Sequence, residues 1–514
     1  MPRHSADGEL TIRNLVAGGA TKAGHTAMAI TAPGRTGLSY GELLNHLDAT
    51  VIALNQLGVG REDPVAIVLP NGPELATAFL GIAAGATTAP LNPGYTADEF
   101  LFYLKDLDAR LLVVAEGSTS AAIPVAARLD IPVATLAVPA NAPAGRFTLE
   151  GQSARTARPG AASADDVALV LHTSGTTSRP KIVPLTQANV CSSAGHIAGG
   201  LALTPADRCL EVMPLFHIHG LIAAVLSSLH AGAGVCCTEG FNALRFFSLL
   251  HEQKPSWYTA VPTMHQAILA RAGRHQDIVK ASSLRFIRSS SASLPPQVMA
   301  DLESTFGCPL IEAYGMTEAS HQMCSNPLPP DQRLAGCVGP AAGPEVAIMN
   351  EAGELLSAGE VGEVVIRGPT VTAGYRNNPE ANASAFTAGW FRTGDQGVLD
   401  GNGYLRLTGR LKEIINRGGE KISPREVDEV LLDHPASDQV VTFAMPHPML
   451  GEDVAAAVVL KSGLAVDEYE LRQFASQRLS SAKVPRRILF LDEIPKGATG
   501  KLQRIGLATK LGLT

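Results

Sequence analysis

Residues 171–181 read Leu-His-Thr-Ser-Gly-Thr-Thr-Ser-Arg-Pro-Lys and continue an apolar run that begins at Val167. An apolar run bounded by turn residues predicts a buried strand that leads into a loop. Backbone N–H groups in a loop rich in glycine and hydroxyl residues, with one lysine, are suited to a polyphosphate. The Walker spacing and a strand-following Gly-x-Gly-x-x-Gly are both absent. The stretch therefore predicts a phosphate-binding loop of another kind, although an ordinary polar surface loop would fit it equally well in isolation.

Length, composition and charge restrict the class of protein. A chain of 514 residues predicts about three folding units, and 46% hydrophobic with 17% charged residues is ordinary globular composition. The net charge of -7 gives no support to nucleic-acid binding. Seven cysteines without a Cys-x-x-Cys favour reduced thiols over disulfides or a zinc site. Neither terminus carries a recognisable targeting signal, so a cytoplasmic protein is expected.

One segment has to be considered as a membrane span, because residues 212–238 contain no Asp, Glu, Lys or Arg. The segment also contains Pro214, three histidines and three glycines, a poor composition for crossing hydrocarbon. We expect instead a buried helix over residues 218–230, followed by a buried strand over 233–237.

The order of the predicted elements indicates the fold class. Strands alternate with helices through the first 307 residues, which implies parallel sheets covered by helices. Short strands separated by glycine turns predict a β-rich subdomain over about 336–410, with strands at 345–349, 362–367, 397–399 and 403–407. The expected fold is α/β, with a large N-terminal domain over residues 1–411 and a small mobile α+β domain over 412–514.

Five further clusters follow the loop along the chain. They are Pro-Leu-Phe-His-Ile-His-Gly at 214–220, Ser-Ser-Ser-Ala-Ser-Leu-Pro at 289–295, Glu-Ala-Tyr-Gly-Met-Thr-Glu at 312–318, Thr-Gly-Asp at 393–395 with Gly409-Arg410, and Pro-Lys-Gly-Ala-Thr-Gly-Lys at 495–501. Six motifs in this order resemble the signature of the adenylate-forming superfamily, which includes acyl-CoA synthetases, firefly luciferase and nonribosomal peptide synthetase adenylation domains. The resemblance covers essentially the whole chain.

The resemblance implies an ATP site. The loop residues that would hold the β and γ phosphates are Thr173, Ser174, Gly175, Thr176, Thr177 and Lys181. The residues that would surround AMP are Ser291, Ala292, Glu312, Ala313, Tyr314, Gly315, Met316 and Thr317, with Tyr314 against adenine. Glu318 would help to hold Mg²⁺, a hard cation that prefers oxygen ligands. Asp395 would accept hydrogen bonds from the ribose hydroxyls, and Arg410 would add a fixed donor fork.

A two-step reaction follows from the same resemblance. Lys501, helped by Thr317, Glu318 and His217, would serve the adenylation step, because a cation offsets the repulsion between the acid and the α-phosphate. The small domain would then turn about Lys412 and present coenzyme A. The residues implied for coenzyme A are Gly418, Gly419, Lys421 and Arg425, although surface charges without a role fit the last two at least as well. One departure is Ser178, where the family commonly has glycine.

The residues around the expected acid site favour a small polar acid. Residues 216–219 offer no carboxylate for the ammonium group of an amino acid, and hydroxyls and imidazoles suit an acid with a second polar end. The motifs at 214–220, 289–293 and 316–329 resemble those of the oxalyl-CoA synthetases of plants and fungi. That resemblance implies that His217, Ser291 and His321 contact oxalate, while His219 either contacts the acid or packs behind it.

Other functions stay open at this point. The chain could be a CoA ligase for another short or aromatic acid, or an adenylating enzyme that loads a carrier protein. A non-catalytic nucleotide-binding protein is disfavoured, because Lys501, Glu318 and Asp395 are all present. The expected partners are therefore a small carboxylic acid, ATP and coenzyme A, with no nucleic acid or membrane, and the sequence is compatible with a monomer or a homodimer.

Overall fold

The structure, a computed structural model, describes residues 10–173, 180–495 and 504–513. The chain forms two compact units. Of the described residues, unit 1 contains 10–173, 181–346 and 366–389, and unit 2 contains Pro180, 347–365, 390–495 and 504–513. The expected α/β fold is confirmed, because unit 1 is built on two mainly parallel sheets and unit 2 is smaller and rich in strands.

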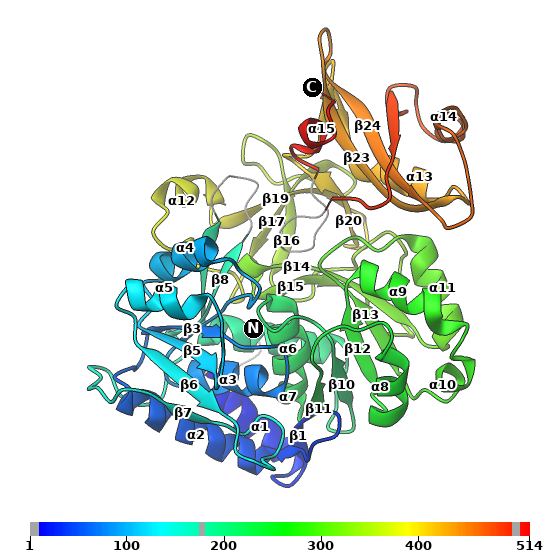
Figure 1. Cartoon of the computed structure of the whole chain (residues 1–514). Coiled ribbons are helices and arrows are strands. Elements are labelled where there is room, and N and C mark those ends of the chain that lie inside the picture. The colour runs from blue at the N-terminus through cyan, green and yellow to red at the C-terminus, as the bar shows by residue number, and fades with distance from the viewer. Residues whose placement is uncertain (1–9, 174–179, 496–503, 514) are drawn as a thin grey trace. The chain divides into compact units, whose positions relative to one another are not determined.

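The first sheet of unit 1 has seven strands. Their order is β7 (Thr148–Glu150), β6 (Val133–Ala137), β5 (Leu111–Ala115), β3 (Pro64–Val68), β4 (Thr87–Pro90), β8 (Val167–Thr173) and β9 (Lys181–Thr186). The five central strands are parallel, and β7 and β9 add antiparallel edges. Helices α4 (Ala97–Leu107) and α5 (Ala122–Arg128) cover one face, and α2 (Tyr40–Gln56) and α3 (Pro73–Ala83) lie on the other (Figure 1).

The second sheet of unit 1 has eight strands. Their order is β15 (His321–Ser325), β14 (Leu310–Met316), β13 (Phe286–Ser289), β12 (Trp257–Ala260), β10 (Arg208–Glu211), β11 (Gly234–Cys237), β1 (Met28–Thr31) and β2 (Leu38–Ser39). Strands β14 to β1 are parallel. One face packs against the helices α8 (Phe246–Gln253), α9 (Pro262–Ala272), α10 (Gln276–Lys280) and α11 (Pro296–Phe306) (Figure 1). Ligands of such sheets bind beyond the carboxyl ends of the strands, where the predicted motifs lie.

The buried helix expected over 218–230 is confirmed, and its first part is of a type that the sequence did not predict. The structure has a π-helix η1 (His219–Leu226) followed by a short α-helix α7 (Ser227–Ala231). Every residue of η1 is buried, so hydrophobic spacing could not distinguish the two helix types. π-helical turns are rare and occur frequently at functional sites.

Unit 2 contains a sheet of long strands with a core on each face. In β23 (Ser437–His447) and β24 (Gly451–Leu460), side chains alternate between the two cores. One core includes Val440 and Val454 with α13 (Pro424–Leu432) and α14 (Glu468–Ser476), and the other includes Val441 and Ala455 with α15 (Leu507–Lys510). Figure 1 shows these helices on opposite sides of the two strands.

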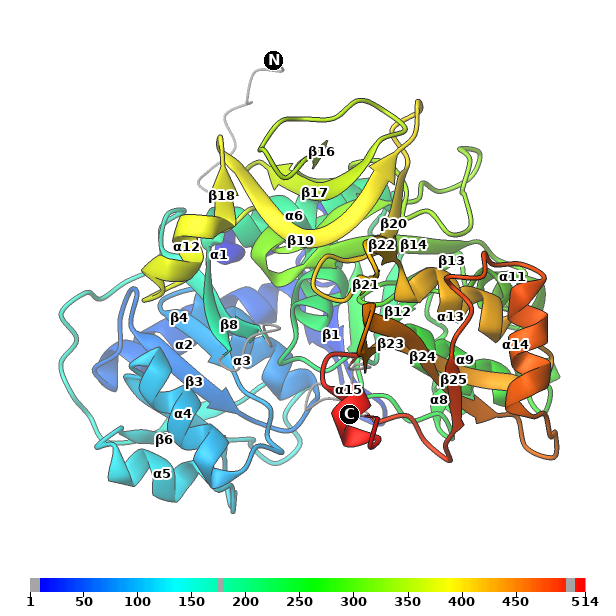
Figure 2. The ribbon, with the colours of Figure 1, turned by 90° about the horizontal axis from the view of Figure 1, so that it is seen from above.

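A second sheet of unit 2 carries the Thr393-Gly394-Asp395 motif. Strand β19 (Trp390–Leu399) is much longer than the strand expected over 397–399, and it is the long curved strand beside β17 (Val361–Arg367) in Figure 2. It pairs with β20 (Leu405–Arg410) in antiparallel register. The motif therefore lies inside a strand, in which Gly394 has a positive φ of 74°.

All seven cysteines are free thiols. Among the residues described, no helix is both long and apolar enough to cross a bilayer, and residues 212–238 form the buried elements η1, α7 and β11.

Candidate active site

The phosphate-loop residues that are described lie at the ends of two paired strands. Thr173 ends β8, Lys181 begins β9, and the two face each other across the antiparallel pair. The predicted residues between them, Ser174, Gly175, Thr176 and Thr177, lie outside the described residues. The Lys181 ammonium lies 4.4 Å from the centre of the Tyr375 ring, a cation–π contact.

Glu318 is connected to Lys181 through this same tyrosine. The Tyr375 hydroxyl donates to Oε1 of Glu318 at 2.9 Å, and burial, followed by the nearby Glu318 charge, raises the pKa of Tyr375. Glu318 is buried in the short 3-10 helix η2 (Thr317–Ala319), directly after β14. One carboxylate fits a Mg²⁺ ion that keeps several waters and binds phosphate oxygens, so the residues present are compatible with the expected metal.

Strand β14 supports the loop that follows β13. Oε1 of the buried Glu312 accepts from the Leu294 amide at 3.1 Å, and the Ser290 hydroxyl donates to the Ala313 carbonyl at 2.9 Å. Between these two anchors lie Ser291 and the exposed Ala292. The predicted nucleotide residues of β14 and of the loop are therefore held together by direct hydrogen bonds.

Three of the residues expected to contact the acid lie together at the carboxyl ends of β12 to β14. Nδ1 of His219 is 2.9 Å from Oγ of Ser291, and its Nε2 is 2.6 Å from Oγ1 of Thr259. The rings of His219 and His321 stack with centres 5.0 Å apart and planes 22° apart. Both histidines are buried, whereas Ser291 is half-buried. The cluster thus presents one hydroxyl in front of two imidazoles.

The backbone at and next to this cluster adopts strained conformations. Ser291 has φ 73°, Ser320 has φ 51° and His321 has φ 93°, values that non-glycine residues rarely adopt. Such conformations persist only when the surroundings fix them, and they concentrate at ligand sites. Here the Ser193 hydroxyl donates to the Ser320 carbonyl at 2.6 Å, which is one of the constraints.

His217, the fourth residue expected at the acid, lies immediately before η1. It is half-buried, and its ring lies 4.7 Å from that of Phe216. Its amide donates to the Pro214 carbonyl at 3.2 Å, and its carbonyl accepts from Leu221 at 3.3 Å, so the backbone at its position is fixed at the start of the helix.

In unit 2, the two residues expected at the ribose face each other across β19 and β20. Oδ1 of Asp395 lies 3.2 Å from Nε of Arg410. Glu363 supports this pair from β17, because its Oε1 accepts from the Gly394 amide at 2.9 Å and its carboxylate pairs with Arg392 at 2.5 Å. The buried Glu363 therefore holds the backbone at Gly394, directly before Asp395.

The expected hinge and coenzyme A residues are mostly exposed. Lys412 lies in a turn after β20, and Gly418 (φ 60°) and Gly419 (φ 95°) form the turn between β21 (Ile415–Arg417) and β22 (Glu420–Ile422). Two consecutive positive φ values are typical of a two-residue hairpin, which explains both glycines without a ligand. Lys421 is exposed, and Arg425 pairs with Glu429 at 3.1 Å. Lys501 lies outside the described residues.

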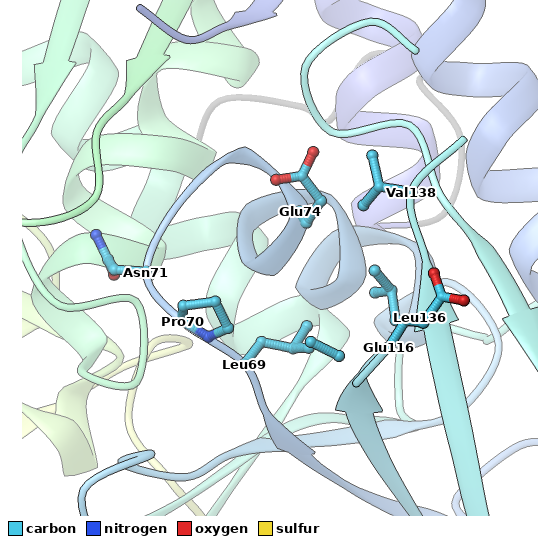
Figure 3. Close-up of a pocket in the computed structure, with 8 residues that line it drawn as sticks. Leu69, Pro70, Asn71, Glu74, Glu116, Leu136 and Val138 are labelled. Atoms are coloured by element: carbon cyan, nitrogen blue, oxygen red, sulfur yellow. The ribbon is translucent and has the colours of Figure 1, made fainter. Parts of the chain in front are cut away.

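A separate cavity of unit 1 contains none of these residues. It has a volume of about 250 Å³ and opens at the carboxyl ends of β3, β5 and β6, where Glu74 and Glu116 lie among apolar neighbours (Figure 3). Arg35 neutralises Glu74 at 2.6 Å. The ion pair with Arg35 therefore explains the Glu74 carboxylate in this cavity without a bound ligand.

Three contributors to the site were not anticipated from the sequence. Arg288 donates to both His219 and His321, Tyr375 binds Glu318, and Glu363 holds Gly394. An arginine inside the apolar strand at 286–289 is a recognisable signal of a buried charge. Tyr375 and Glu363 have no comparable local signal, since only tertiary folding brings them to their partners.

Comparison with known proteins agrees with the motifs. Residues 17–376 match the model of the AMP-binding enzyme family, and residues 426–501 match that of the AMP-binding enzyme C-terminal domain. The oxalate–CoA ligase of Arabidopsis thaliana is 46% identical over 93% of this chain and 94% of its own length. The oxalate–CoA ligase of Saccharomyces cerevisiae is 43% identical over 87% and 86%. ATP-bound MatB from Rhodopseudomonas palustris superposes with a TM-score of 0.87 at 27% identity, over 97% and 98%.

The family match covers more than half of the chain, and both oxalate–CoA ligases align with it over most of their length. The fold, the order of the six motifs and these matches lead to one conclusion: the chain belongs to the adenylate-forming AMP-binding enzyme family, as an AMP-forming acid–CoA ligase.

Proposed function

We propose that the acid is oxalate, so that oxalate, ATP and coenzyme A give oxalyl-CoA, AMP and pyrophosphate. The observation that carries this proposal is the cluster of Ser291, His219 and His321. A second polar end of the substrate must be paired once it leaves water, and a hydroxyl backed by imidazoles can pair it. The names of the two relatives from Arabidopsis thaliana and Saccharomyces cerevisiae support the same acid.

The proposed first step joins the acid to AMP. An oxygen of one oxalate carboxylate attacks the α-phosphorus, and the bond to pyrophosphate breaks. His217, Ser291 and His321 contact the acid and orient it, while the phosphate loop with Lys181 holds the β and γ phosphates. Glu318 would hold Mg²⁺, which neutralises phosphate charge when bound. Lys501 supplies the cation that offsets repulsion between the two anions.

The proposed second step forms the thioester. The sulfur of coenzyme A attacks the acyl carbon, and the bond between that carbon and the AMP oxygen breaks. We place the division between the large and the mobile domain at residues 411 and 412, with the rotation at Lys412. Asp395 and Arg410 would hold the ribose of AMP through the reaction, Gly418 and Gly419 would line the pantetheine path, and Lys421 and Arg425 would face the phosphates of coenzyme A.

Pyrophosphate release from MgATP tests this function, measured with and without coenzyme A for oxalate, malonate, glycolate, acetate and palmitate. We expect release with oxalate that depends on coenzyme A, and little with acetate. Turnover of palmitate in preference to oxalate would refute the short-acid assignment. A thioester formed on a phosphopantetheinylated carrier protein, but not on free coenzyme A, would identify a carrier-loading enzyme instead.

The His321→Ala variant tests the acid site separately from the nucleotide site. We expect it to raise the KM for oxalate more than it slows the ATP half-reaction with a surrogate acid. The exposed His251 of α8 provides the matched control, because His251→Ala removes an imidazole from the same unit at a helix surface. Equal losses in both measurements would indicate a general structural role for His321.

A further inference from the structure

Arg288 is a fully buried cation at the centre of unit 1. It lies on β13 between core residues, and its side chain has no exposed surface. Nη1 donates to Oγ1 of Thr259 at 3.3 Å and to Nε2 of His219 at 3.4 Å. Nη2 donates to Nε2 of His321 at 3.2 Å and to Oε1 of Gln322 at 3.2 Å. All four acceptors belong to uncharged groups.

No carboxylate of the described chain neutralises this guanidinium. Arg288 takes part in no ion pair within residues 10–173, 180–495 and 504–513, and its Nε has no hydrogen-bond partner there. Burial lowers the pKa of Arg288 to about 9, which leaves the group protonated at neutral pH. A buried charge without a counter-ion lowers the stability of the fold, and an apolar side chain of similar volume would make the fold more stable at this position. The charge is therefore best explained by an anion that completes the site.

The hydrogen bonds of Arg288 have a fixed direction. A guanidinium has donors only, so Nε2 of His219 and Nε2 of His321 must both accept. The remaining ring hydrogen of His219 is then on Nδ1, which donates to Ser291 at 2.9 Å. The hydroxyl hydrogen of Ser291 is thereby left to donate to an acceptor beyond the cluster. Arg288 therefore donates to His219, and His219 donates to Ser291, so the hydrogen bonds run in one direction from the guanidinium to the Ser291 hydroxyl.

We propose that Arg288 determines the specificity of the acid site, by selecting acids that carry a second anionic group. It acts as a positioning residue: it fixes the two histidines as Nδ1–H tautomers and adds a positive charge behind Ser291, His219 and His321. An uncharged second end would gain nothing from that charge, whereas a second carboxylate would supply the missing counter-ion. The inference rests on the proposed function, since it explains how the same site would recognise the far carboxylate of oxalate.

The experiment compares oxalate with oxamate, in which an amide of nearly the same shape replaces the second carboxylate. We expect Arg288→Met to lower kcat/KM for oxalate by about 100-fold or more, mainly through KM, and to change kcat/KM for oxamate less than about 3-fold. Arg288→Lys keeps the charge and should retain part of the preference for oxalate. Arg271→Met is the charge-matched control, because Nη1 of Arg271 donates to the Ala267 carbonyl of its own helix at 3.1 Å.

Binding provides a second measurement that a structural role would not explain. Addition of oxalate to the MgATP-bound protein should raise the thermal midpoint further for the native protein and for Arg271→Met, but not for Arg288→Met. Equal losses of kcat/KM for oxalate and oxamate would overturn the inference. If Arg288→Met fails to fold, Arg288→Gln takes its place, because it removes the charge and keeps a hydrogen-bond donor. A ratio of kcat/KM for oxalate to that for oxamate equal to the ratio of the native protein would then overturn the inference.

The proposed function and this inference can fail separately. If the native protein prefers another dianionic acid, such as malonate, the oxalate assignment fails and the same comparison is made between malonate and its half-amide. Loss of that preference in Arg288→Met would still support the inference. If the native protein prefers monoanionic acids of the same length, both are overturned.

Discussion

The carbonyl oxygen of His321 occupies the space that a side chain at Gly315 would need. A Cβ at Gly315 would lie 1.6 Å from that oxygen, because β14 and β15 approach each other closely at a register shift between Tyr314 and Gly315. The glycine of the Tyr-Gly-Met-Thr-Glu motif is therefore required by the strand that carries His321. The close approach of β14 and β15 thus connects the expected nucleotide motif at Gly315 to the expected acid site at His321.

We expect Gly315→Ala to separate these strands and to displace His321. The cost should exceed the ~1–3 kcal/mol typical of overpacking, since the clash is with backbone that cannot rotate away. Activity with oxalate should fall at least 10-fold even in the fraction that folds. Gly273→Ala is the control, because Gly273 has φ −59° and nothing within 4 Å of an added Cβ. Thermal midpoints and oxalate kinetics of both variants test the expectation, and matching values would contradict it.

Tyr375→Phe should raise the Mg²⁺ concentration at which the reaction reaches half of its maximal rate. The change removes the donor that lies 2.9 Å from Oε1 of Glu318 and leaves the ring beside Lys181. A carboxylate that loses a hydrogen bond becomes a less well oriented ligand, and such outer contacts typically contribute 10- to 100-fold in metal affinity or activity. Titration of pyrophosphate release with Mg²⁺ measures the shift. The exposed Tyr469 gives the control Tyr469→Phe, and an unchanged Mg²⁺ midpoint in Tyr375→Phe would rule out this role of the hydroxyl.

The fold could be predicted from the sequence because its signals are local. The strand expected at 111–115 is β5, and the helix expected at 262–272 is α9, which begins at Pro262, the preferred first position for proline. The type of η1 could not be predicted, because buried apolar residues on all sides give the same pattern for either helix. The residues of the site could be predicted only where they belong to one of the six motifs.

The contacts that organise the acid site join residues far apart in the chain. His219 binds Ser291 and Thr259, and Arg288 binds His321, across separations of 72, 40 and 33 residues. Motif order identified His219, Ser291 and His321 as candidates, but not which of them touch. Arg288 required the register of β12, β13 and β15, since no local rule pairs an arginine in one strand with histidines elsewhere.

Glu211 should make the stability of unit 1 depend on pH. Its carboxyl has no exposed surface, and burial raises its pKa to about 8, with the nearby Met213 amide and Asn71 side chain offsetting only part of that effect. Between about pH 4.5 and 8 the folded state therefore holds a proton that the unfolded state has released, so stability falls as pH rises through this range. The loss is complete above the folded pKa.

Glu211→Gln removes this titration. Relative to the native protein, the variant should be more stable at pH 8 than at pH 5, by an amount on the order of a few kcal/mol. Thermal midpoints at pH 5.0, 6.5 and 8.0 measure the difference. The exposed Glu351 supplies the control Glu351→Gln, for which the difference should not vary. A constant difference for Glu211→Gln across the three pH values would show that Glu211 does not titrate in this range.

Arg504 anchors the chain three residues after Lys501. Its side chain is half-buried. The guanidinium lies 2.7 Å from Asp428 of α13 and 3.3 Å from Glu413, and donates to the Thr442 carbonyl of β23 at 2.8 Å. Arg504→Met would leave the buried Asp428 without its counter-ion, which typically costs about 3–5 kcal/mol. We expect faster hydrogen exchange of the β23 and β24 amides. We also expect slower adenylation, because the position three residues after the proposed catalytic Lys501 would lose its contacts with α13 and β23.

The double variant Asp428→Leu with Arg504→Met separates the two effects of this change. Replacing both partners of a buried ion pair by apolar groups is often close to neutral, so amide protection in β23 and β24 should recover to a large extent. Adenylation should stay slow, since Arg504 would still be absent beside Glu413 and the Thr442 carbonyl. Recovery of the adenylation rate together with protection would mean that Arg504 serves only the stability of unit 2.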